Sequence, residues 1–130
     1  MEFYLPASPG EWLAWGSAAF TLALGLVAMF APRIMLKVMR LTTLPDRESA
    51  LAEIRASYGG FRIGTGLACM LLHPQPLLYL ALGAAWIATA FGRLLSMLSD
   101  KGMTVFNWLY IVVELGLAAA ALSYALGLVA

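Results

Sequence analysis

Charged side chains are scarce in this 130-residue chain, at 12% against about 25% in an ordinary soluble domain. Hydrophobic residues make up 62% of the chain, and its mean hydropathy is +0.85. A chain this short could not hide so much apolar surface inside a water-facing globule, because small domains bury the smallest share of their surface. The scarcity of charge therefore predicts an all-α integral membrane protein.

Cysteine and recognisable catalytic motifs are also scarce. The single cysteine excludes an intramolecular disulfide and a cysteine-based metal cluster. The formal net charge of +1 gives no polybasic field of the kind that binds nucleic acid. The sequence has no P-loop, no G-x-S-x-G, no zinc signature and no dinucleotide fingerprint. We therefore expect no nucleic-acid partner, no metal and no cofactor.

The chain contains long apolar stretches. A helix needs roughly 20 mainly apolar residues to cross a bilayer. Four stretches reach that length, and they are residues 12–31, 49–73, 77–99 and 104–129. Pro32 ends the first stretch, and Ser49 is a suitable N-cap for the second. The sequence predicts a single membrane domain built as a four-transmembrane-helix bundle.

A short basic segment, residues 33–41, follows the first stretch. Arg33, Lys37 and Arg40 are spaced i, i+4, i+7 and share one helical face, with apolar residues between them. This pattern predicts an interfacial amphipathic helix whose cations reach anionic headgroups; a simple basic loop is the alternative. Lysine and arginine favour the cytoplasmic side, so both termini are expected on the non-cytoplasmic side of a bacterial inner membrane.

Three charged residues, Arg62, Arg93 and Glu114, fall inside the predicted spans. Each costs about 2.5–3.5 kcal/mol at the centre of a span, so they must pair, snorkel or line water. Counted at about 1.5 Å per residue, all three lie in the middle to cytoplasmic half of the bundle. We expect them to meet in a polar pocket that binds an anionic group. The predicted ligand-binding residues are Arg62, Arg93, Glu114, Tyr58, Arg55, Tyr110 and Asn107.

Two structural alternatives remain open at this point. Arg93 could snorkel to the cytoplasmic interface, which would leave Arg62 and Glu114 as a pair that fixes helix register. Small residues at Gly60 and Gly64, and a row at Ala84, Ala88 and Gly92, predict close helix approach. That approach is either intramolecular packing or homodimerisation.

The chain resembles a bacterial family of small four-helix membrane proteins of unknown function. The resemblance rests on Glu53-Ile54-Arg55, Tyr58-Gly59-Gly60, Gly64, Gly66, Gly92-Arg93 and Glu114. It covers the second to the fourth stretch, and the R-x-x-Y-G-G signature is its most specific part. The family implies the four-helix architecture and no particular activity.

Three functions fit these features. The first is a membrane protein that binds or transports an anionic lipid or a small anion in the polar pocket. The second is an accessory or scaffold subunit of a larger membrane complex, or a homo-oligomer. The third is an intramembrane enzyme that uses Glu114 with Tyr110 or Tyr58. The chain lacks a nucleophile beside Glu114, so we expect the first function and do not expect catalysis.

Overall fold

The computed structural model describes residues 3–130, and every regular element in that range is helical. Three helices, α1 (Pro9–Phe30), α5 (Pro76–Ser99) and α6 (Val105–Ala125), are long and apolar enough to cross a membrane. They occupy the first, third and fourth apolar stretches. The all-helical class predicted from composition is confirmed.

The second apolar stretch folds into a continuous but irregular helical run. It consists of η1 (Glu48–Ala50), α3 (Leu51–Glu53), the π-helical η2 (Ile54–Gly60) and α4 (Phe61–Leu71). Its longest regular part, α4, has 11 residues, which is too short to cross a bilayer by itself. The predicted N-cap at Ser49 is wrong, because Arg47 precedes the run and no side chain caps it.

The described residues divide into two compact units. The hairpin unit comprises the chain up to Ser17 together with Leu72–Ala130, and the basic unit is Ala18–Leu71. Helix α1 begins in the hairpin unit and ends in the basic unit.

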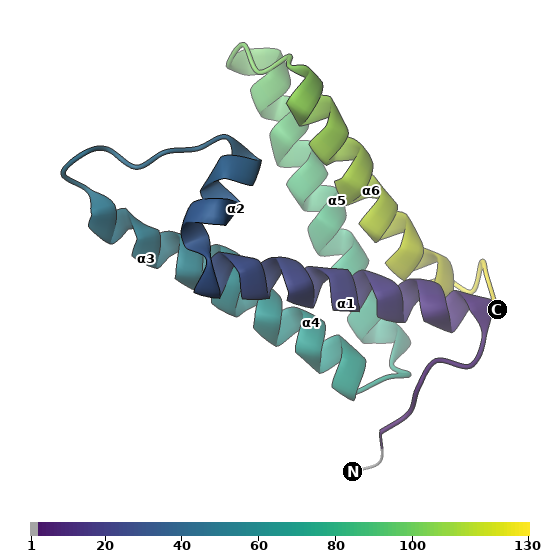
Figure 1. Ribbon diagram of the computed structural model, residues 1–130. Coiled ribbons are helices and arrows are strands. Elements are labelled where there is room, and N and C mark those ends of the chain that lie inside the picture. Colours follow the sequence, from purple (N-terminus) through teal and green to yellow (C-terminus); the bar gives the residue numbers. More distant parts are fainter. Residues whose placement is uncertain (1–2) are drawn as a thin grey trace. The chain divides into compact units, whose positions relative to one another are not determined.

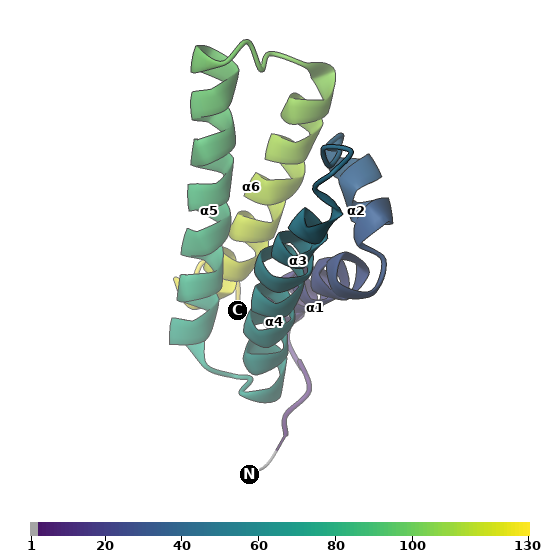
Figure 2. The ribbon, with the colours of Figure 1, turned by 90° about the vertical axis from the view of Figure 1, so that its left-hand side faces the viewer.

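In the hairpin unit, α5 and α6 run antiparallel and side by side along their whole length (Figures 1 and 2). Gly83 lets them approach, because a Cβ at this position would lie 2.4 Å from Cγ of Leu122 on α6. The start of α1 is tied to α6 by the Ser17 hydroxyl, which donates to the carbonyl oxygen of Leu117 at 2.8 Å.

In the basic unit, the second half of α1 packs antiparallel against η2 and α4 (Figure 1). A Cβ at Gly59 would lie 2.9 Å from the Met29 backbone, and one at Gly66 would lie 2.7 Å from the Ala18 carbonyl oxygen. At Gly64, by contrast, a Cβ would meet nothing within 4 Å. The glycines that allow close packing are therefore Gly25 on α1 with Gly59 and Gly66, and the predicted Gly60–Gly64 row is not the one in closest contact.

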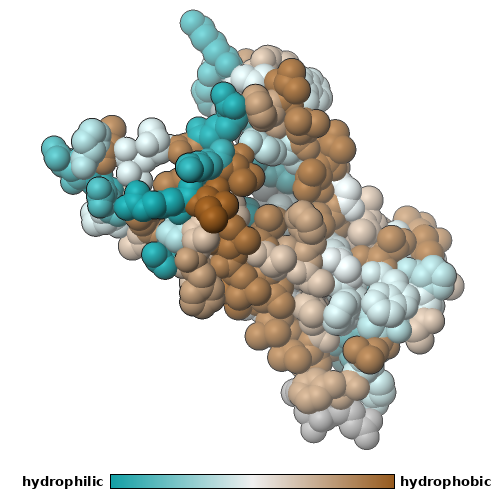
Figure 3. Space-filling model, in the orientation of Figure 1, coloured by the Kyte–Doolittle hydropathy of each residue, from teal (hydrophilic) through white to brown (hydrophobic). Residues whose placement is uncertain are grey.

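The basic segment forms α2 (Pro32–Met39), as its periodicity predicted. Pro32 starts the helix, and Arg40 ends it in the left-handed conformation with φ 60°. Met35 and Leu36 are buried in a small core with Ala28 and Ile54. Figure 3 shows hydrophilic residues gathered over α2 and the loop after it, whereas apolar residues cover most of the remaining visible surface.

Candidate functional site

A charge pair between α5 and α6 lies inside the hairpin unit. Arg93, on α5, donates from Nε to Oε1 of Glu114 at 2.9 Å and from Nη2 to Oε2 at 2.7 Å. The two parallel hydrogen bonds form a bidentate pair, which is the strongest geometry available to arginine and a carboxylate. The side chain of Glu114 is 7% exposed and that of Arg93 is 26% exposed. The alternative in which Arg93 snorkels away from Glu114 is wrong.

Two more of the predicted residues complete this cluster. Nη1 of Arg93 donates to Oδ1 of Asn107 at 3.1 Å, and the guanidinium lies 4.9 Å from the Tyr110 ring centroid. Asn107, Tyr110 and Glu114 share one face of α6, as their i, i+3, i+7 spacing predicted. Asn107 is itself held by the α5–α6 turn, because its Nδ2 donates to the Gly102 carbonyl oxygen at 2.8 Å.

Within this cluster the guanidinium of Arg93 faces the carboxylate of Glu114, and no buried side-chain nitrogen or oxygen in residues 3–130 lacks a hydrogen-bond partner. An anion placed at Arg93 would have to compete with Glu114 and would be repelled by it. The bidentate pair therefore fixes α5 against α6.

The other predicted site residues, Arg55, Tyr58 and Arg62, belong to the basic unit. Arg55 donates to the carbonyl oxygen of Met29 in the last turn of α1, where carbonyls lack helical partners and a cation is favourable. The guanidinium of Arg62 lies 5.1 Å from the Tyr58 ring centroid. The meeting of Arg62 with Arg93 and Glu114 in one pocket stays a prediction.

Three hydroxyl side chains of α4 and α5 form hydrogen bonds within their own part of the chain. The hydroxyls of Thr65 and Thr89 donate to carbonyl oxygens one turn back in their own helices, at 2.7 and 2.8 Å. The hydroxyl of Ser96 donates to the carboxylate of Asp100 at 2.9 Å. Short hydroxyl side chains reach acceptors on their own helix more readily than a distant partner.

The R-x-x-Y-G-G signature coincides with the π-helical stretch Ile54–Gly60. Its arginine caps α1, and Gly59 lets the Met29 backbone approach. π-Helical stretches inside α-helices are uncommon and occur frequently at functional sites. Through the contacts of Arg55 and Gly59, the motif joins α1 to the helical run from η1 to α4.

Most of the chain matches one protein-family model. Residues 10–125 match the family described as Domain of unknown function (DUF4345). The chain belongs to this family. No curated protein and no solved structure matches it.

The match spans both the Arg93–Glu114 cluster and the π-helical signature. The expectation of an uncharacterised family is thereby confirmed, and the family description assigns no activity to either feature.

Sequence reasoning missed a second buried polar cluster in the hairpin unit. His73 Nε2 lies 2.9 Å from Oε1 of Glu11, and its Nδ1 lies 2.7 Å from the Tyr79 hydroxyl. The ring centroids of Tyr124 and Tyr79 lie 5.5 Å apart. The Ser8 hydroxyl donates to Oε2 of Glu11 at 3.0 Å.

The side chains of Tyr79 and His73 are fully buried. Glu11 and His73 are 62 residues apart, so no local spacing could have paired them. The only available signal was the principle that a buried histidine needs partners for both ring nitrogens.

Proposed function

We propose that this chain is a four-span protein of a bacterial inner membrane that binds an anionic lipid through its basic unit. Helices α1, α5 and α6 are long and apolar enough to support the membrane location. The helical run from η1 to α4, which is second in chain order, is proposed as the remaining span. With α2 and its cations at the cytoplasmic surface, both termini lie on the other side.

The distribution of charge between the two units carries the proposal. The basic unit holds six of the eight lysines and arginines but only three of the seven acids. Its charged residues are Arg33, Lys37, Arg40, Arg47, Arg55 and Arg62, against Asp46, Glu48 and Glu53. The rest of the chain has two basic residues against four acids. A positive surplus beside a bilayer attracts anionic headgroups.

Helix α2 has the form that such binding requires. Met35 and Leu36 anchor one side in the small core, and Ile34 and Val38 are exposed apolar side chains that can enter the headgroup boundary. Each lysine or arginine held near an anionic leaflet adds about 1 kcal/mol of attraction.

The Arg93–Glu114 cluster takes a supporting role in this proposal. Its charges cancel, so a lipid phosphate or a small anion gains more from the surplus cations of the basic unit. Among these cations, Arg62 lies on α4, within the proposed span from η1 to α4. It is the residue best suited to hold a ligand deeper in the membrane.

The proposal is tested by lipid preference. The full chain is reconstituted in nanodiscs of equal phosphatidylglycerol and phosphatidylcholine, and the lipids retained after extraction are quantified. We expect enrichment of phosphatidylglycerol, lowered several-fold in Lys37→Gln/Arg40→Gln because two attractions of about 1 kcal/mol are lost. Lys101→Gln, in the hairpin unit, is the matched control and should keep the enrichment. Equal retention of both lipids by the wild type would refute the proposal.

A role as a scaffold subunit is the second candidate, and one observation favours it. Ala84, Ala88 and Gly92 form a row on α5 that is exposed in the structure, and a Cβ at Gly92 would meet nothing within 4 Å. Rows of small residues allow close helix contact in membranes. Co-purification with a larger protein in mild detergent, lost in Ala88→Leu, would favour this candidate; a monomer without a partner would count against it.

A further inference from the structure

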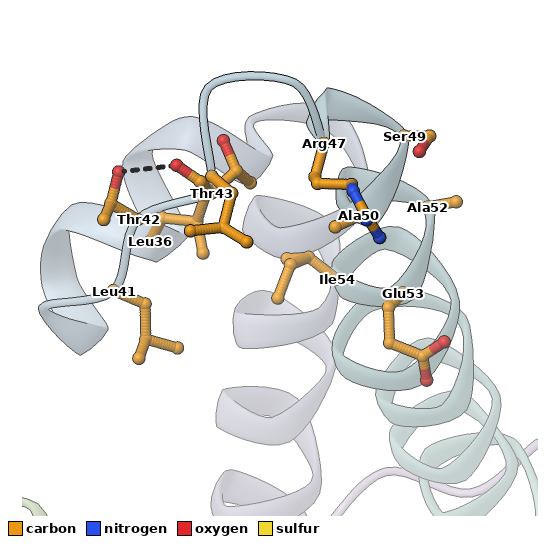
Figure 4. Close-up of a pocket in the computed structure, with 11 residues that line it drawn as sticks. Leu36, Leu41, Thr42, Thr43, Arg47, Ser49, Ala50, Ala52, Glu53 and Ile54 are labelled. Carbon is orange, nitrogen blue, oxygen red and sulfur yellow. Dashed lines mark hydrogen bonds between the residues drawn. The ribbon is translucent and has the colours of Figure 1, made fainter.

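A cavity of about 620 Å³ lies within the basic unit, between the end of α2 and the start of the second helical run. Its lining comes from Leu36 and residues 41–44 on one side and from Arg47 to Ile54 on the other (Figure 4). The volume is in the range of about 300–1,000 Å³ typical of small-molecule sites. The cavity is therefore large enough to admit part of a ligand.

The lining combines two kinds of chemistry. Leu36, Leu41 and Ile54 supply apolar walls, while Thr43, Ser49 and Arg47 supply hydroxyls and a cation. An amphiphile, which has an apolar chain and a polar head, matches both kinds of surface. A free inorganic anion would leave the apolar walls without a partner.

The outer edge of the cavity also favours a lipid. Leu41 and Leu44 are 50% and 67% exposed, which is unfavourable in water but suits the boundary of a bilayer. They follow α2 in the chain, and Val38 on α2 is also exposed. An acyl chain that leaves the cavity would therefore meet exposed apolar side chains.

Charge complementarity selects the head of the amphiphile. Within residues 3–130, no ion pair or hydrogen bond engages the side chain of Arg47. The acid in the lining, Glu53, accepts a hydrogen bond from the Ser57 hydroxyl, and its carboxylate points away from the loop in Figure 4. A phosphate is the natural partner for a guanidinium in this position.

We propose that this cavity binds one anionic phospholipid. The phosphate binds the guanidinium of Arg47, and the first part of one acyl chain lies among Leu36, Leu41 and Ile54. This inference rests on the proposed lipid-binding function and assigns it a defined site.

The test uses native mass spectrometry of the full chain after reconstitution with phosphatidylglycerol, phosphatidylethanolamine and phosphatidylcholine. Ala50→Trp fills the cavity from an exposed position of its lining, and Ala56→Trp adds the same ring at an exposed position outside the lining. Arg47→Gln removes the cation of the lining, and Lys101→Gln removes a cation of the hairpin unit outside it. Circular dichroism checks that helicity is unchanged; if Ala50→Trp lowers it, Ala52→Trp takes its place.

The wild type is expected to retain one phosphatidylglycerol molecule. Ala50→Trp and Arg47→Gln should each weaken that binding about tenfold, while Ala56→Trp and Lys101→Gln should change it by less than about threefold. If both tryptophan variants retain the lipid equally, the cavity assignment is overturned while the proposed function stands. If phosphatidylethanolamine is retained as strongly, the assignment of an anionic head is overturned. If the wild type prefers no lipid, both proposals fail.

Discussion

The two units differ in how their charged side chains are balanced. In the hairpin unit, Arg93 is neutralised by Glu114, and His73 is held between Glu11 and Tyr79. In the basic unit, cations outnumber acids by three and are concentrated on and around α2. The comparison teaches that the charges of the hairpin unit are paired within it, whereas the basic unit keeps a surplus of cations, which we propose to bind a ligand.

Breaking the Arg93–Glu114 pair should have the largest effect. Glu114→Gln leaves the partly buried Arg93 without its counter-charge, which should lower the free energy of unfolding by about 3–5 kcal/mol. Replacing both partners, in Arg93→Leu/Glu114→Leu, should recover much of that loss, because two apolar residues need no pairing. Reversible unfolding in detergent measures both variants. A loss below about 0.5 kcal/mol in Glu114→Gln would show that the pair is not structural.

The close contact of α1 with α4 supports the basic unit and should come next in size. Gly66→Ala places a Cβ 2.7 Å from the Ala18 carbonyl oxygen and should cost about 1–3 kcal/mol of stability. Gly64→Ala is the matched control on the same helix, where the space is open. It should be neutral or stabilising by up to about 1 kcal/mol. Equal effects of the two substitutions on thermal unfolding would contradict the observed packing.

The histidine cluster gives the smallest effect of the three. Tyr79→Phe removes the hydroxyl that meets Nδ1 of His73 and should cost about 1 kcal/mol, because a buried ring nitrogen loses its partner. Tyr124 contacts the same rings, but its hydroxyl makes no hydrogen bond within residues 3–130, so Tyr124→Phe should change stability by less than about 0.5 kcal/mol. The two variants are compared by chemical unfolding. A larger loss for Tyr124→Phe would reverse the assignment.

Much of the fold could be predicted because it depends on local patterns. Apolar length located the helices, and the spacing of Arg33, Lys37 and Arg40 predicted α2. The i, i+3, i+7 spacing of Asn107, Tyr110 and Glu114 correctly indicated one face of α6. Arg93 was placed on the adjoining helix at a matching depth, so its contact with Glu114 was within reach of sequence reasoning.

The rest depends on information that a local pattern does not carry. No sequence pattern predicted the π-helical stretch Ile54–Gly60. The spacing of Gly60 and Gly64 predicted a close helix approach, whereas a Cβ would meet the α1 backbone at Gly59 and Gly66. The Glu11–His73 pair joins distant segments, and the cavity beside Arg47 is formed by a loop whose path follows no periodicity.

The most direct test of the difference between the two units is a map of lipid contacts. The full chain is reconstituted with a photoactivatable phosphatidylglycerol, irradiated and digested, and the labelled peptides are identified by mass spectrometry. The account predicts that headgroup labelling concentrates between Arg33 and Arg55 in the basic unit. Labelling concentrated around Arg93 and Glu114 would contradict it.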